Sequence, residues 1–219
     1  AKLPLAGGTM TGNLVLSTAN SQVGIGTDNM QIFNSVGGSS GLVVTGVSSS
    51  TAILGNTLSN ITIANGDGTA DNTAALHFAR EDTDGNPNYA GASVVSQFKE
   101  TQVTGQYPKA DLAFLTSTAA NNAPSEKMRI DAAGNVGIGV TPETWASIMK
   151  VVQIGNAAVR EESTNVGLSQ NAYYDGTNTR WEYITTNKAS DYYQLEGSHN
   201  WRVAPSGTAD SAISWTTAM

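Results

Sequence analysis

The chain has 219 residues and a formal net charge of −7, yet only 13% of its residues are charged, about half the share in an ordinary soluble domain. It has no basic stripe to neutralise phosphates and no apolar run long enough to span a bilayer, which argues against nucleic-acid partners and membrane insertion. It also has no cysteine, so disulfides and thiol chemistry are excluded.

The first 60 residues hold only two charged side chains, Lys2 and Asp28. A free monomer normally keeps a well-charged surface. Disordered segments combine low hydrophobicity with high net charge, whereas this stretch keeps alternating aliphatic residues. We therefore expect the region to be buried against copies of itself.

Further along the chain, short apolar runs of period two predict strands, among them 112–114 and 128–130. Turn dipeptides separate them, as at Asp67-Gly68 and Gly134-Asn135. The sequence thus predicts an all-β fold of short β segments and small β domains.

One helical signal interrupts this pattern, and it predicts a short helix near 142–149. Pro142 suits the first helical position, and Trp145, Ile148 and Met149 fall on one helical face.

A short motif is repeated along the chain. Val23–Gly26 (VGIG) recurs at Val136–Gly139, and a weaker copy stands at Val152–Gly155 (VQIG). In such a strand the glycines leave one face bare, where another backbone can approach closely. A shared axis between chains is favoured over a bulge or a tight bend, with Val136 and Ile138 as axis residues.

Aromatic residues divide the chain, because all four Phe lie before residue 115 and all four Trp lie after residue 140. We expect an N-terminal fibrous segment at 1–40, a central β domain at 41–125, a connector with the repeat and the helix at 126–155, and a C-terminal β-meander at 156–219.

Two motifs give the chain a resemblance to bacteriophage tail fibres and tailspikes. Leu3–Leu14 (LPLAGGTMTGNL) looks like a fibre-shaft motif, and Met128–Gly139 (MRIDAAGNVGIG) looks like an element that often lies upstream of a C-terminal intramolecular chaperone. Asn171–Gly176 and Ala204–Ala209 are similar to further fibre segments.

The resemblance implies an elongated, fibrous homotrimer on a virion, located in the tail fibre, that mediates adsorption to the host. It implies as partners other tail or baseplate proteins and a host cell-surface glycan or protein. In such a trimer the apolar side chains expected at the shared axis are Leu5, Met10, Leu14, Leu16, Val136 and Ile138.

A polysaccharide-degrading tailspike fragment is the main alternative, and it would need two facing carboxyl groups. Glu161 and Glu162 would point to opposite faces of a strand, while Asp82 and Asp84 lie in a turn-rich loop. His77 and the other histidine, His199, lack a nucleophile context. We therefore predict no catalytic residues and no enzyme activity. A bacterial trimeric adhesin, the third alternative, would share the composition but not the two motifs.

Two loops carry oxygen ligands at alternate positions, Asp82–Asn86 and, more weakly, Asp67–Asp71. A calcium loop counted from Asp82 would need a bidentate Glu at its twelfth position, where Ser93 stands. Plain turns are favoured, and we predict no metal site and no cofactor.

The C-terminal aromatic residues are the candidates for receptor contact, because aromatic rings stack on sugars. Burial in the core or in the trimer interface is the favoured alternative. The candidates are Trp181, Tyr183, Tyr192, Tyr193 and Trp201.

The last six residues, Ser214–Met219, resemble the first half of the Met128–Gly139 element and stop where the partner strand should begin. We expect the encoded protein to continue beyond residue 219 into another Asp-x-x-Gly-Asn turn. The alternative is that this is the native end and that neighbouring chains of the trimer cover the strand.

Overall fold

A computed structural model describes residues 34–36, 39–41, 63, 65–80, 89–120 and 122–218. The chain divides into two units, Ala1–Ile61 and Thr62–Met219. In the first unit, β1 (Asn34–Val36) pairs with β2 (Ser39–Gly41) as an antiparallel hairpin. Several residues singled out in the sequence lie outside the described residues: Leu5, Met10, Leu14, Leu16, the Asp82–Asn86 loop and Met219.

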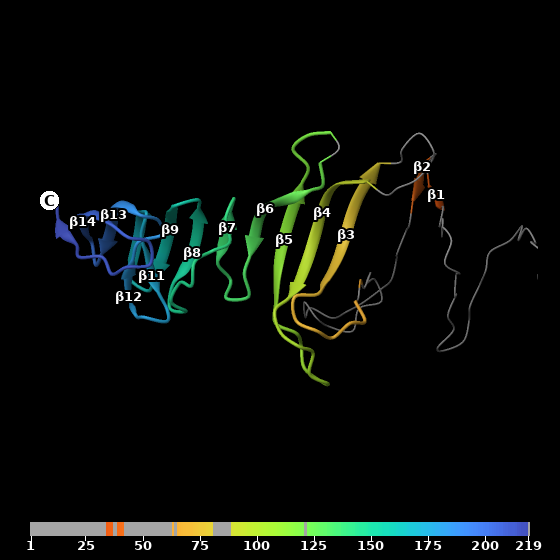
Figure 1. Ribbon diagram of the computed structural model, residues 1–219, viewed down its shortest axis with the longest axis horizontal. Helices are drawn as coiled ribbons and strands as arrows, with labels where there is room; N and C mark the ends of the chain where they lie inside the picture. Colours follow the sequence, from red (N-terminus) through yellow and green to blue (C-terminus); the bar gives the residue numbers. More distant parts are fainter. Residues whose placement is uncertain are drawn as a thin grey trace, which may run out of the picture. The chain divides into compact units, whose positions relative to one another are not determined.

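In the second unit the described strands form one sheet of eleven strands and a separate two-stranded hairpin (Figure 1). The hairpin consists of β11 (Tyr173–Asp175) and β12 (Arg180–Glu182). The described residues contain no helix, so the all-β prediction is confirmed for them. The strands of the sheet are β3 (Thr73–Arg80), β4 (Tyr89–Phe98), β5 (Ala110–Thr116), β6 (Ser125–Ile130), β7 (Val136–Ile138), β8 (Lys150–Ile154), β9 (Ala157–Glu162), β10 (Asn165–Gln170), β13 (Asn187–Leu195), β14 (Ser198–Gly207) and β15 (Thr216–Thr217).

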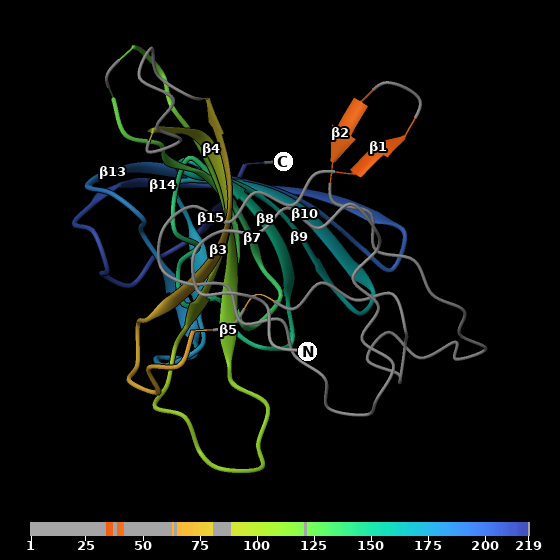
Figure 2. The same ribbon diagram turned by 90° about the vertical axis from the view of Figure 1, so that its right-hand side faces the viewer.

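The strands follow one another across the sheet in chain order, and the β11–β12 hairpin is set aside between β10 and β13. Every pairing is antiparallel except that of β7 with β8. Figure 2 looks along the row of strands and shows β3 to β5 running steeply while β13 and β14 lie nearly flat. This progressive rotation is the twist that L-residues impose on a sheet.

The parallel pair places two copies of the repeat side by side. Val136 lies opposite Val152 and Ile138 opposite Ile154. A Cβ on Gly137, between them on the other face, would overlap the Val140 carbonyl oxygen. The backbone that approaches the bare face of Gly137 therefore belongs to this same chain, in the segment that connects β7 to β8.

That crossover, residues 139–149, corrects the predicted helix at 142–149. The Ala146 N–H donates to the Tyr174 carbonyl at 3.0 Å, and the Glu143 N–H donates to the Gln153 side chain at 2.9 Å. These donors are engaged by β8 and β11 instead of by a helical turn. Trp145 and Met149 are buried as their apolar character demands, while Ile148 is exposed. The helix prediction is wrong because non-local bonds replaced the local ones.

Two clusters of buried residues form the core, and both lie on one face of the β8–β14 part of the sheet. The first joins Val151 and Ala158 to residues of the crossover and of β11; the second joins Ala189 and Ala204 to residues between β10 and β15. We call this side of the sheet the covered face and the opposite side the open face. The first cluster is Trp145, Met149, Val151, Ala158 and Tyr173, and the second is Ala172, Tyr183, Ala189 and Ala204.

Candidate functional site

The open face carries two rows of residues that lie directly opposite one another from strand to strand, and neither row contains a charged side chain. The first row runs from β3 to β14 through Ala74, Ser96, Leu112, Ile130, Val136, Val152, Val159, Leu168, Tyr192 and Trp201. The second runs from β3 to β15 through Leu76, Val94, Phe114, Met128, Ile138, Ile154, Ala157, Gln170, Ser190, Val203 and Thr216.

Many of these apolar side chains remain accessible. Leu168 is 54% exposed, Ile154 53% and Trp201 42%, whereas their strand neighbours Val151, Ala158 and Ala204 on the other face are buried. Period-two alternation therefore separates a covered and an open side of the same strands. From β5 to β9 both rows are wholly apolar, and polar residues such as Ser96 and Gln170 occur only toward their ends. Nothing from the described chain is packed on this face.

The opposite side of β3 to β6 mixes charged and polar residues with small and aliphatic ones. Arg129 donates hydrogen bonds to Gln97 at 3.0 Å, to Asp111 at 2.5 Å and to Glu126 at 2.6 and 2.8 Å. Its hydrogen bond with Glu126 raises the pKa of Arg129 above its ordinary value. The charged groups on this side are thus paired with one another, and the open face is the side of this half of the sheet that carries no charge in its rows.

The covered face of β8–β14 contains a buried charge cluster. Arg160 makes a bidentate ion pair with Asp191 at 2.9 and 3.0 Å, and Arg202 reaches the same carboxylate at 2.8 Å. Both guanidinium groups lie over the ring of Trp181, at 4.7 and 4.6 Å from its centroid. A Cβ on Gly167 would overlap the Arg160 guanidinium, so only glycine fits there. Burial lowers the pKa of Arg160, while the Asp191 charge opposes that shift.

The five candidate receptor residues are divided between the two faces. Tyr183 is buried in the second core cluster and donates to the Pro205 carbonyl at 2.7 Å. Trp181 is partly buried against both clusters, and Tyr193 lies beside Arg202, on the covered side. Tyr192 and Trp201 are on the open face.

Those two rings form an aromatic group with His199. The centroids of Tyr192 and Trp201 are 5.0 Å apart, and the ring of His199 stacks on Tyr192 at 5.9 Å with an interplanar angle of 23°. Beside them the open face has a pocket of about 360 Å³, where Ala157 and Ser190 replace bulkier residues of the second row. Aromatic rings beside a shallow, mostly apolar pocket suit either the face of a sugar ring or another protein surface.

The carboxylates considered for hydrolysis do not converge. Glu161 and Glu162 occupy successive positions of β9, so their side chains take opposite faces. Glu182 is a buried carboxylate that accepts hydrogen bonds from Asn178, Arg180 and Tyr173 at 2.7–2.9 Å. Burial acts to raise its pKa, but those donors leave the pKa below its ordinary value. Glu182 therefore holds the β11–β12 hairpin together and has no room for a substrate.

His77, which lacks a nucleophile context in the sequence, lies 2.8 Å from the Ser93 hydroxyl through its Nδ1. The two residues are opposite each other on β3 and β4. A hydrolase would require a third group to orient the imidazole. The hydrogen bonds of His77 within the described chain include no such carboxylate, so the pair has the character of a cross-strand contact.

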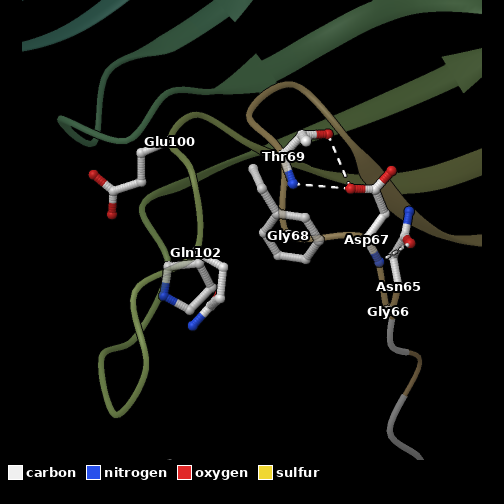
Figure 3. Close-up of a pocket in the computed structure, with 9 residues that line it drawn as sticks. Asn65, Gly66, Asp67, Gly68, Thr69, Glu100 and Gln102 are labelled. Atoms are coloured by element: carbon white, nitrogen blue, oxygen red, sulfur yellow. Dashed lines mark hydrogen bonds between the residues drawn. The ribbon is translucent and has the colours of Figure 1, made fainter.

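The weaker calcium-like loop is closed by its own hydrogen bonds (Figure 3). Asp67 Oδ1 accepts from the Thr69 N–H and hydroxyl, each at 3.0 Å, which lowers the pKa of Asp67. Glu100 points away from this carboxylate across a pocket of about 180 Å³. Among the residues that the structure describes, no group of three or more His, Cys, Asp or Glu side chains is arranged to hold a metal ion.

The sequence predicted a functional contact for Val136, Ile138, Tyr192 and Trp201 but not for the other members of the open face. The sequence signal for these residues was the alternation of apolar and polar positions within each strand, as at Val152 and Ile154. That they form continuous rows depends on the register of every strand pairing, which the sequence does not reveal. Sequence reasoning also passed over Tyr107, in the β4–β5 loop, which is 85% exposed.

The chain matches no family model and no curated protein. In the described part of the chain, no helix has the length and apolar character needed to cross a membrane.

Proposed function

We propose that this chain is a structural and host-receptor-binding component of a phage tail fibre or tailspike. It forms an elongated homotrimer on the virion and mediates adsorption to the bacterial surface. Its partners are copies of itself, other tail or baseplate proteins, and a glycan or protein of the host surface. It is not an enzyme and uses no cofactor.

The observation that carries this proposal is the structural use of the fibre-like motif at 128–139. The motif forms the antiparallel pair of β6 and β7, in the middle of the large sheet. Its four large apolar side chains all belong to the rows of the open face: Met128, Ile130, Val136 and Ile138. The motif therefore supplies an apolar surface that the described part of the chain does not cover.

The remaining positions of the motif shape its turn. The Asp131 carboxylate accepts from the N–H groups of Ala133 and Asn135 at 2.9 and 2.8 Å. Gly134 has a φ of +88°, a conformation that costs glycine least. A motif that closes a tight turn and presents apolar side chains on one face suits repeated use in a fibre.

The test is competition for adsorption. Purified protein, labelled with a fluorophore, is incubated with a panel of bacterial strains, and the strains that bind it are then challenged with the phage whose tail carries this chain. We expect saturable binding to the strains that the phage infects, and slower phage adsorption after pre-incubation. Sedimentation equilibrium of the same sample is expected to give the mass of three chains.

Two outcomes would replace the proposal. Binding to no strain, with unchanged phage adsorption, would remove the receptor-binding role. Release of oligosaccharides from bacterial polysaccharide, abolished by a single Asp or Glu substitution, would assign the chain to the polysaccharide-degrading tailspikes instead.

A further inference from the structure

We propose that the open face is where the copies of this chain meet, so that Tyr192 and Trp201 are contacts between subunits and not contacts with a receptor. This inference rests on the self-association in the proposed function and names the surface that performs it. The occupants of the open face are the neighbouring copies of the same chain in the trimer, whose open faces point toward one shared axis and present the same two rows.

The size of the surface supports a protein occupant. Neighbouring strands lie about 4.8 Å apart, so a row that crosses eleven strands is about 48 Å long. Along the strands, the two rows with their side chains are about 12 Å wide, which gives the surface an area of roughly 600 Å². The largest apolar patch on a typical monomer is about 300–600 Å². A stable interface buries about 800 Å² of accessible surface per partner, and the accessible area of protruding side chains exceeds their footprint. The open face is thus large enough for one stable interface.

The charge pattern supports a copy of the chain itself. The chain has a net charge of −7, so two copies repel one another except where their facing surfaces carry no charge. The two rows are such a surface. Charged residues of this face stand outside the rows, for example Lys150, which lies directly opposite Glu161. An apolar centre with a charged rim is the composition of a protein interface.

The other side of the sheet cannot serve the same purpose. On β8–β14 it is occupied by the chain's own core clusters, and on β5 and β6 it carries the ion pairs of Arg129 with Asp111 and Glu126. Burying those charged groups against another chain would cost more than burying aliphatic ones. The open face is therefore the side on which a copy can be seated.

A glycan is the rival occupant near Tyr192 and Trp201, and the rows argue against it. Sugar recognition needs polar side chains beside the aromatic rings, and the rows supply mainly Gln170 and Ser190 there. From β5 to β9 the same rows are aliphatic or aromatic without polar partners, so a glycan would leave most of this surface in water. A second copy covers the whole length.

The experiment uses the absence of cysteine from the chain, which lets a single nitroxide be placed at one position. Leu168→Cys places it on the open face, and Ile148→Cys is the matched control: Ile148 is also aliphatic and exposed, at 62%, but lies in the crossover that covers the other face. Distances between labels are measured by pulsed electron resonance in the assembled protein. Because stacked sheets lie about 10 Å apart, we expect roughly 10–20 Å at position 168 and about 30 Å or more at position 148.

A second pair of variants measures the energy of the contact. Leu168→Asp puts a charge into the first row of every copy and should convert the assembly to monomers at micromolar concentration, whereas Ile148→Asp should leave the assembly intact. If the wild-type protein is an oligomer but the labels at position 168 are far apart, or Leu168→Asp stays assembled, the open face is not the interface although self-association stands. If the wild-type protein is a monomer, both self-association and this inference are overturned.

Discussion

The Asp191 carboxylate forms ion pairs with two guanidinium groups, that of the buried Arg160 and that of the partly buried Arg202. The side chains of Asp191 and Arg160 are 0% and 1% exposed. Removing one partner of such a pair leaves a buried charge without compensation, which typically costs about 3–5 kcal/mol. We expect Asp191→Asn to lower the free energy of unfolding by about that amount, as measured by urea unfolding at fixed protein concentration.

The control is an aspartate ion pair at the surface, with a lysine as its partner. Asp71 meets Lys99 at 2.7 Å with side chains that are 66% and 33% exposed, so Asp71→Asn should cost at most about 1 kcal/mol. Equal losses for the two variants would show that the buried cluster contributes no more than a surface pair. A loss confined to Asp191→Asn would identify the cluster as the anchor of the covered face.

At the scale of elements, the crossover 139–149 is held to the β11–β12 hairpin through Asp175. The Asp175 carboxylate accepts from the Thr144 hydroxyl and from the Asn178 N–H, each at 2.6 Å. The hydrogen bond from Thr144 is the main cause that lowers the pKa of Asp175. A carboxyl group whose pKa is lower in the folded than in the unfolded state stabilises the fold above its unfolded pKa, about 3.9 for Asp, and this stabilisation is lost as the pH falls through the folded pKa.

We therefore expect Thr144→Val to be less stable than the wild type at neutral pH and to lose less stability between about pH 5 and pH 2. Valine keeps the shape of threonine but cannot donate to Asp175. Urea midpoints of both proteins across this pH range measure the effect. Parallel pH profiles would mean that the Thr144 hydrogen bond does not depend on the charge of Asp175.

How far the sequence predicted these elements depends on whether their bonds are local. Alternation within one strand predicted strands such as β5 and β6, and the Gly134 turn followed from its dipeptide. The helix at 142–149 failed because Gln153 and Tyr174, distant along the chain, take the donors that a helix would use. The parallel pairing of β7 with β8 leaves no local signal, although the repeat that it joins was visible.

The candidate site was predicted only in part for the same reason. Val136 and Ile138 were assigned to a contact between chains from their alternation with glycine. Val159 and Leu168 were not, because their membership of the first row follows from the register of β9 with β10. Tyr183 follows Trp181 at a period-two spacing, yet β12 ends at Glu182. Tyr183 is buried within the second cluster, whereas Trp181 is only partly buried against both clusters.

At the scale of the whole second unit, buried apolar clusters pack on one part of the sheet and not on the other. The strands β8 to β14 have core clusters on one face. The strands β3 to β5 have no comparable apolar cluster on either face among the described residues, and most of β3 is exposed along its length. Open twisted sheets rarely exceed about ten strands without other support. A protein surface packed on the open face would supply the missing apolar contacts, above all for β3 to β6.

This unevenness predicts a gradient in amide hydrogen exchange, which reports local opening. In the assembled protein we expect the slowest exchange in β9, β10 and β13, and the fastest in β3 and β15, the outermost described strands of the sheet. In the Leu168→Asp variant we expect protection to fall further in β3 to β6 than in β8 to β14. The second group keeps its core clusters when the copies separate, while the first loses the apolar contact that the open face provides.

The position of the substitution makes this result informative. Leu168 lies in β10, so purely local damage would expose β9, β10 and β13 and leave the distant β3 and β4 unchanged. Because β3 and β4 are distant from Leu168, their amide protection can fall only if the copies separate and uncover the rows along their whole length. Exchange that rises around β10 alone would contradict that account. With Ile148→Asp as the control, the protection of β3 and β4 should remain that of the wild type.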